Sequence, residues 1–176
     1  LENLKDKVNL LDVAVGNHSN GLTNRDVTAV KIRNYDMKPT FDFKLNENFP
    51  KLKYIEIINS GIQKLANKFK YLKELMVIDM SFNKIMKLPD FFKNNHKLLY
   101  VNFEGNFLTW IQLDIFKFNL QLEFLNLQNN TCVDIDAIGK TEIADARNFI
   151  KTNCQNSTFS DQHKYKIKKQ NESAPL

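Results

Sequence analysis

The sequence predicts an α/β fold in which short coils of chain stack into a solenoid beside one parallel β-sheet. An apolar pattern recurs four times, each copy carries Asn or Ser at the same position, and Phe recurs in register in the second half. The copies LKYIEIINSGI, LMVIDMSFNKI, LLYVNFEGNFL and LEFLNLQNNTC begin at residues 52, 75, 98 and 122. Such a period is typical of repeat architectures, in which each unit buries its apolar side against its neighbours.

Each copy has the form apolar-x-x-apolar-x-apolar-x-x-Asn/Ser-x-apolar, and a degenerate earlier copy, VTAVKIRNYDM, covers residues 27–37. This pattern is similar to the leucine-rich repeat, whose period is about 20–29 residues. The sequence therefore predicts about five coils of a leucine-rich-repeat solenoid. The parallel sheet is expected on the concave face, with an irregular or 3-10 convex side.

The first half of each coil alternates apolar and polar residues, as a strand with one buried side does. In the coil that begins at residue 75, Ile78 and Met80 are expected in the core, and the outward side chains are expected to be Val77, Asp79 and Ser81. Stacked coils would place such strands about 4.8 Å apart in a parallel sheet.

An asparagine ends the strand segment of most coils, and the backbone explains why. The chain turns there with its polar groups pointing inward, and an amide side chain both donates and accepts hydrogen bonds. We expect coil-to-coil bonds from Asn83, Asn106 and Asn130, with Ser60 in this place in the second coil and Tyr35 or Asp36 near it in the first.

Phenylalanine dominates the aromatic residues, with 14 Phe against 5 Tyr and 1 Trp. Three of them, Phe69, Phe92 and Phe116, recur 17 or 18 residues after their repeat starts. This register predicts a stack of rings on the convex side rather than three isolated core residues.

The repeats also predict caps, because an open solenoid end exposes core and an unpaired strand edge. Residues 8–15 alternate as a strand that could cover the first coil, and residues 142–151 form an amphipathic helical pattern with Ile143, Ala146 and Ile150 on one face. The expected organisation is an N-terminal cap at 1–26, leucine-rich repeats at 27–131, a C-terminal cap at 132–154 and a flexible tail at 155–176.

The two cysteines, Cys132 and Cys154, stand at the two ends of the expected C-terminal cap. Two thiols alone do not make a structural zinc site, which needs four ligands. Two interpretations stay open, a disulfide and a pair of reduced buried thiols. A bridge would join the cap helix to the last repeat, which favours the disulfide.

The formal net charge is +5, with both signs mixed along the chain. No apolar run approaches the roughly 20 residues that span a bilayer, so no membrane insertion is expected of this chain. Its start at Leu1 suggests an excised or processed ectodomain. The three histidines, at 18, 96 and 163, are scattered without a Ser or Cys partner at catalytic spacing.

Two further site classes are not expected either. Asp134 and Asp136, beside Cys132, are interpreted as turn and helix-start residues rather than metal ligands. The outward aromatic residues border acids rather than Lys or Arg, which argues against nucleic-acid binding. The sequence therefore predicts no enzyme, no metal site and no cofactor.

Three stretches resemble secreted or cell-surface insect leucine-rich-repeat proteins: GNHSNGLTNRDVTAVKI (16–32), FPKLKYIEIINSGIQKL (49–65) and NNTCVDIDAIG…IKTNC (129–154). The resemblance covers about residues 8–154 and includes a C-terminal cap with a cysteine at each end. It implies an extracellular binding protein of a group partly linked to innate immunity. Relatives often carry cysteines in the N-terminal cap, and this chain has none there. That cap is therefore cut short or held by strand pairing alone.

The outward strand positions form three columns on the expected concave face. The first is Ala29, Tyr54, Val77, Tyr100 and Phe124; the second is Lys31, Glu56, Asp79, Asn102 and Asn126; the third is Arg33, Ile58, Ser81, Glu104 and Gln128. An exposed aromatic stripe beside acids and amides suggests a protein contact. The expected partner-binding residues are Tyr54, Glu56, Ile58, Val77, Asp79, Tyr100, Asn102, Glu104, Phe124 and Asn126.

The function predicted from these features is recognition of a protein partner, with a homo- or heterodimer as one possible form. Two alternatives stay open: an adhesive or structural ectodomain, and a small-molecule or glycan binder with a hollow between the sheet and the Phe stack. Glycosylation sequons occur at Asn17, Asn129, Asn156 and Asn171, which fits an extracellular protein.

Overall fold

In the computed structural model of the chain, the described residues are 23–37, 40–41, 45–65 and 67–155. The strand expected at 8–15 lies outside them, and so do residues 156–176 of the tail expected at 155–176. The elements in chain order are η1 (Asn24–Asp26), β1 (Ala29–Arg33), β2 (Thr40–Phe41), α2 (Leu45–Asn48), β3 (Tyr54–Ile58), β4 (Lys64–Leu65), η2 (Phe69–Tyr71), β5 (Val77–Asp79), β6 (Lys87–Leu88), β7 (Tyr100–Asn102), β8 (Trp110–Ile111), β9 (Phe124–Asn126), β10 (Asp136–Ile138) and α3 (Gly139–Asn153).

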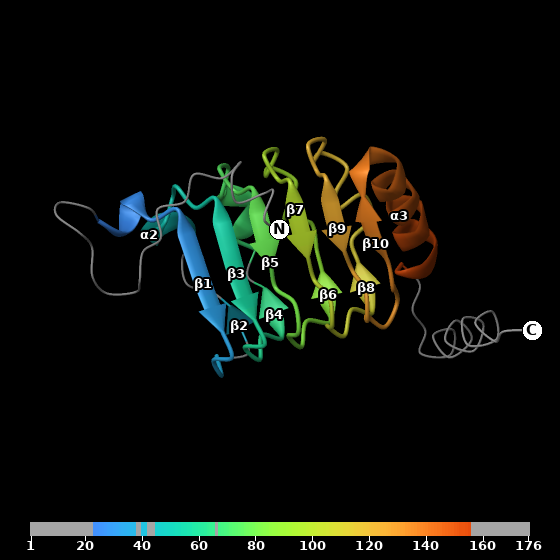
Figure 1. Cartoon of the computed structure of the whole chain (residues 1–176), viewed down its shortest axis with the longest axis horizontal. Helices are drawn as coiled ribbons and strands as arrows, with labels where there is room; N and C mark the ends of the chain where they lie inside the picture. The colour runs from blue at the N-terminus through green and yellow to red at the C-terminus, as the bar shows by residue number, and fades with distance from the viewer. Residues whose placement is uncertain (1–22, 38–39, 42–44, 66, 156–176) are drawn as a thin grey trace, which may run out of the picture.

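A six-stranded sheet runs along the molecule in the order β1-β3-β5-β7-β9-β10 (Figure 1). The first five strands are parallel, and each successive coil contributes one of them. Tyr54 pairs with Val77, Val77 with Tyr100, and Tyr100 with Phe124. The predicted repeat register and the predicted parallel-sheet solenoid are thereby confirmed.

The opposite side of the solenoid carries short strands and turns, and the core lies between the two sides. The strands pair as β2 with β4 and β6 with β8. The rings of Phe69 and Phe92 lie 6.0 Å apart, and those of Phe92 and Phe116 lie 6.0 Å apart and stacked. All three are buried, which confirms the predicted stack. Phe103 reaches Phe92 from the sheet side at 6.1 Å, so these rings occupy space in which the alternative of a small-molecule or glycan binder requires a hollow.

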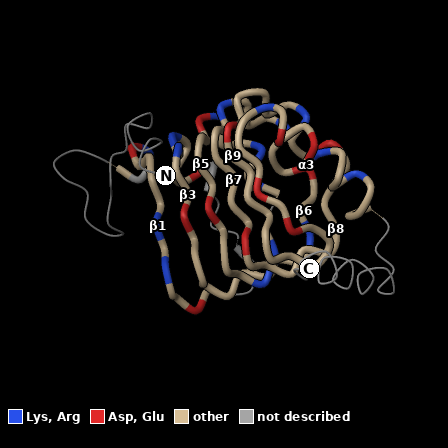
Figure 2. Tube along the Cα trace, turned by 45° about the vertical axis from the view of Figure 1, so that its right-hand side comes forward, with Lys and Arg blue, Asp and Glu red and all other residues tan. Residues whose placement is uncertain are grey.

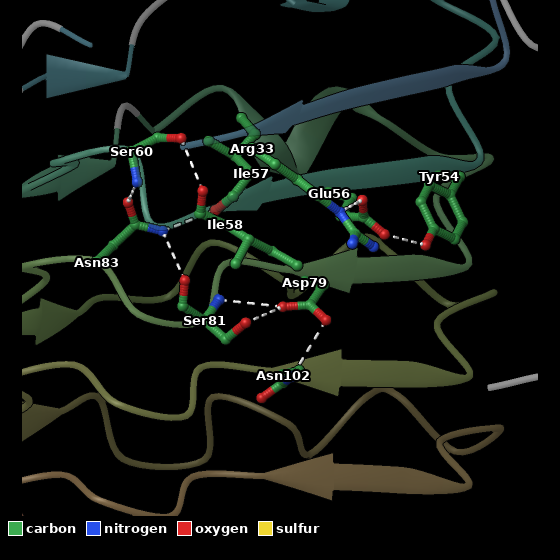
Figure 3. A network of polar contacts seen from close by, with 10 residues as sticks. All are labelled: Arg33, Tyr54, Glu56, Ile57, Ile58, Ser60, Asp79, Ser81, Asn83 and Asn102. Atoms are coloured by element: carbon green, nitrogen blue, oxygen red, sulfur yellow. Dashed lines mark hydrogen bonds and ion pairs between the residues drawn. The ribbon is translucent and has the colours of Figure 1, made fainter. Parts of the chain in front are cut away.

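The asparagine ladder forms as predicted. Asn83 Oδ1 accepts a bond from the backbone N–H of Ser60 at 3.0 Å, and its Nδ2 donates to the carbonyl of Ile57 at 2.7 Å (Figure 3). The same oxygen also accepts from the backbone N–H of Ile62 at 3.2 Å. These partners belong to the preceding coil. Asn106 and Asn130 repeat the arrangement one and two coils later. Each amide therefore satisfies inward backbone groups that would otherwise lie unpaired in the core.

A second asparagine ladder, which the sequence analysis missed, lies on the opposite side. Asn95 Nδ2 donates to the carbonyls of Phe69 and Leu72 at 2.9 and 2.6 Å. Asn119 Nδ2 donates to those of Phe92 and Asn95 at 3.0 and 2.8 Å. Both asparagines are fully buried. The signal was in the sequence, because each follows a Phe of the stack by three residues.

The C-terminal cap consists of one strand and one helix. The helix α3 is longer at both ends than the expected span of 142–151, and its buried residues are the predicted Ile143, Ala146 and Ile150. The strand β10 was not predicted, because residues 134–136 were interpreted as turn and helix-start residues. It pairs antiparallel with β9, and Ala137 is buried opposite Leu125. The cap thus extends the sheet by one strand before the helix covers the end of the core.

Cys132 and Cys154 form a disulfide, with their Cα atoms 5.3 Å apart. Of the two interpretations left open by the sequence, the bridge is therefore the correct one. The backbone N–H of Ile111 donates to the carbonyl of Cys154 at 3.3 Å, so the end of α3 is also bonded to the coil of β8.

The inner ladder makes a prediction for stability. Asn83→Ala leaves several buried backbone groups without partners, and each such group costs about 1–3 kcal/mol. We expect the free energy of unfolding, measured by urea denaturation, to fall by about 3 kcal/mol or more. The matched control is Asn94→Ala, since Asn94 belongs to the same coil as Asn83 but is exposed. Equal losses in the two variants would contradict the ladder.

The disulfide makes a second prediction. Replacing Cys132 and Cys154 by Ser releases the loop between them, which is worth about 3 kcal/mol at this length. The same urea titration measures the loss. Wild-type protein unfolded in the presence of a reductant is the control and should match the double variant. A double variant as stable as the oxidised protein would show that the bridge does not hold the cap.

Candidate binding face of the sheet

The side of the six-stranded sheet that points away from the core is named here the sheet face. It is the surface for which the repeat pattern predicts a concave shape. Register pairing aligns the first column, Ala29, Tyr54, Val77, Tyr100 and Phe124, and the second column, Lys31, Glu56, Asp79, Asn102 and Asn126. The structure therefore brings together the residues that were predicted as neighbours.

The sheet face continues onto β10, which the sequence analysis did not foresee. Ile138 pairs with Phe124 and extends the first column, and Asp136 pairs with Asn126 and extends the second. Ile138 is 65% exposed, whereas Phe124 is half-buried. These two residues give the face an accessible apolar patch at its C-terminal end.

The first column corrects one expectation, because most of its aromatic stripe is not exposed. Tyr54, Val77 and Tyr100 are only 5%, 1% and 4% exposed, and with Ala29 they form a second hydrophobic cluster. Adjacent coils place equivalent side chains side by side, since strands in a sheet are about 4.8 Å apart. The rings of Tyr100 and Phe124, for example, stack at 4.5 Å. The column thus acts as packing surface along most of its length.

From Glu56 to Asn126 the second column is also buried, and its side chains belong to a polar network (Figure 3). Glu56 accepts from Arg33 Nε at 2.6 Å and from the Tyr54 hydroxyl at 2.7 Å. One coil later, Asp79 accepts from the Ser81 hydroxyl at 2.7 Å and from Asn102 Nδ2 at 3.1 Å. The expectation that Glu56, Asp79, Asn102 and Asn126 are exposed is therefore wrong: all four are buried, and each bonds to a side chain of a neighbouring coil.

The third column carries the next acid of the network and reaches further into solvent. Glu104 accepts from Asn126 Nδ2 at 3.1 Å and from Asn129 Nδ2 at 3.4 Å. Glu104, Ile58 and Gln128 are half-buried. Together with the Phe124 and Ile138 patch, these side chains form the accessible part of the sheet face.

Charge is distributed unevenly along the sheet face. Figure 2 shows Lys and Arg on β1 and acids on β3 and β5. Burial opposes ionisation of Glu56, but the bonds from Arg33 and Tyr54 lower its pKa below the ordinary 4.5. Burial, together with the nearby Asp79, raises the pKa of Tyr100 well above the ordinary 10.0. Burial raises the pKa of Tyr54 in the same way, so at neutral pH both buried phenols are neutral and Glu56 is ionised.

A column of left-handed residues borders the sheet face and was also missed. Asn34, Asn59, Phe82, Gly105 and Asn129, each just before the ladder position, have φ angles between 48° and 64°. Asn and Gly adopt this conformation readily, whereas a bulky aromatic residue rarely does. Phe82 is 52% exposed, and a Cβ atom added to Gly105 would lie 2.6 Å from its ring. Glycine at 105 therefore leaves room for Phe82.

The predicted sequons are only partly within the described chain. Asn17, Asn156 and Asn171 lie outside it, so their glycosylation stays a prediction. Asn129 is exposed at the edge of the sheet face, where its side chain contacts Glu104. A glycan on Asn129 would therefore border the accessible part of the face.

Neither a metal centre nor a membrane-spanning helix is found in the described part of the chain. Across residues 23–155, as far as they are described, no group of three or more His, Cys, Asp or Glu could hold a metal ion. No helix in the same part of the chain is long and apolar enough to cross a membrane.

The Glu56 network makes a prediction for pH dependence. A carboxyl group whose pKa is lowered by folding stabilises the native state above its unfolded pKa, and this stability is lost as the pH falls through the folded pKa. Unfolding free energy should therefore decline below about pH 4.5 in the wild type and decline less in Glu56→Gln. Asp145→Asn, which removes one exposed carboxylate, is the control. Parallel wild-type and Glu56→Gln curves would contradict the network.

Comparisons with known proteins show the fold. Neither a family model nor a curated protein matches the sequence. Among solved structures, a leucine-rich-repeat protein of Leptospira interrogans is similar, with a TM-score of 0.56 and 18% sequence identity. The similarity covers 73% of this chain, and the chain spans only 30% of that protein. This chain accordingly folds as a leucine-rich-repeat solenoid with a disulfide-linked C-terminal helix.

Proposed function

We propose that the chain is a non-enzymatic binding module that recognises a protein partner through the sheet face. The observation that carries this proposal is the accessible apolar patch of Phe124 and Ile138 beside the fixed polar row of the face. Aromatic and aliphatic side chains at the centre of a polar surface are typical anchors of protein interfaces.

The rigidity of the face supports the same proposal. Glu104 is half-buried and held by Asn126 and Asn129, so this acid is oriented before a partner arrives. Preorganised side chains lose less conformational entropy on binding. The exposed Asp136 adds a further carboxylate beside the patch. A partner that offers an apolar side chain flanked by Lys or Arg would complement this end of the face.

We further propose an extracellular location and a role in recognition. The disulfide favours an oxidising compartment, which supports an extracellular protein. The resemblance of three sequence stretches to secreted insect proteins supports a role in recognition or innate immunity. A second copy of the chain, as in a homodimer, is one candidate partner.

The test uses the immobilised protein to capture partners from extracellular fluid of its source, followed by affinity measurement with the identified partner. We expect Phe124→Ala combined with Ile138→Ser to weaken binding at least about tenfold, because central interface residues each contribute on the order of 1–2 kcal/mol. The control is Leu120→Ser, which removes a 73% exposed apolar residue from the turn before β9. Equal affinity of the double variant and the wild type, with both folded, would reject the sheet face.

A further inference from the structure

A cavity of about 260 Å³ lies between the turns that follow β8 and the helix α3 of the C-terminal cap. It is separate from the sheet face, and we name it the cap cavity. Its lining includes Leu113, Phe116, Lys117, Arg147, Ile150 and Lys151. Both walls are fixed, since Ile150 is buried against the core and the bond from Ile111 to Cys154 joins the end of α3 to the coil of β8.

Arg147 is the unusual group in this lining. Its Nε atom is buried and has no hydrogen-bond partner. Burial lowers the pKa of its guanidinium from the ordinary 12.5, so nearby charges do not compensate the lost hydration. An arginine nevertheless stays protonated in proteins. The structure therefore contains a partly dehydrated cation, whose charge an anion bound at the accessible end of the guanidinium would balance.

The other charges around the cap cavity add to this positive potential. The lining has three cations, Lys117, Arg147 and Lys151, and one acid, Asp114. Asp114 already lies 3.6 Å from Lys117 in an ion pair. Lys151 is exposed at the rim. One acid thus faces three cations, and the balance favours an anionic ligand.

We propose that the cap cavity binds a small organic carboxylate. The carboxylate would accept hydrogen bonds from the Arg147 guanidinium, whose planar donors match carboxylate geometry. Its apolar body would lie against Leu113, Phe116 and Ile150, which line the same cavity. The volume is below the roughly 300–1,000 Å³ of sites for drug-sized ligands, so the ligand is small. This proposal is independent of partner binding by the sheet face.

The test follows the Arg147 Nε–H resonance by NMR in the whole chain. Sodium benzoate is the probe, benzamide its uncharged counterpart, and inorganic phosphate the test for anions in general. We expect benzoate to shift the resonance saturably, and benzamide to have no effect. Phosphate binding as tight as benzoate binding would overturn the carboxylate assignment, and so would a benzoate shift that does not saturate.

Variants complete the test, with benzoate affinity measured by calorimetry. Arg147→Met should abolish binding and should not lower Tm, because it removes a dehydrated, unpaired charge. Arg147→Lys keeps the charge but loses the planar fork, and should bind at least tenfold more weakly than wild type. Arg25→Met, an exposed arginine in the turn before β1, is the matched control and should bind normally. Wild-type affinity in both Arg147 variants would overturn the proposal.

Discussion

The inner asparagine ladder is the interaction on which the rest of this solenoid depends. Each coil must turn out of its strand with backbone groups pointing into an apolar core, where unpaired N–H and C=O groups are strongly unfavourable. One buried amide bonds those groups of its own coil and of the coil before it. Asn83 alone reaches Ile57 and Met80 through Nδ2 while accepting from Ser60. Because these bonds cross between coils, they also fix the register of the sheet.

The sequence alone was enough to predict a feature wherever one residue type has a single physical role in the repeat. Asn83, Asn106 and Asn130 occur at one position because an amide side chain supplies both the donor and the acceptor that the backbone of two coils needs there. The Phe stack and the buried face of α3 follow from periodicity alone. The disulfide could be favoured but not decided, because two cysteines at the ends of a cap are compatible with either redox state.

The errors concern features that depend on neighbours in space. Alternation showed that Tyr54 and Tyr100 point outward, but it could not show that they pack into a cluster and stay inaccessible. The strand β10 has three residues, and its pairing with β9 depends on the reversal of the chain after Cys132 rather than on its own pattern. Phe82 gave no signal, because its left-handed backbone is uncommon for its residue type and its ring lies against Gly105 of the next coil.

The antiparallel direction of β10 has a consequence for how this architecture can change in length. Every coil from β3 to β9 offers the next one the same parallel edge and the same row of backbone acceptors. A duplicated coil between β7 and β9 would therefore find compatible neighbours on both sides. The edge of β10 offers no such match, and α3 covers the core beside it. Lengthening by whole coils is thus compatible with the interior of the solenoid, and β10 sets the point where it stops.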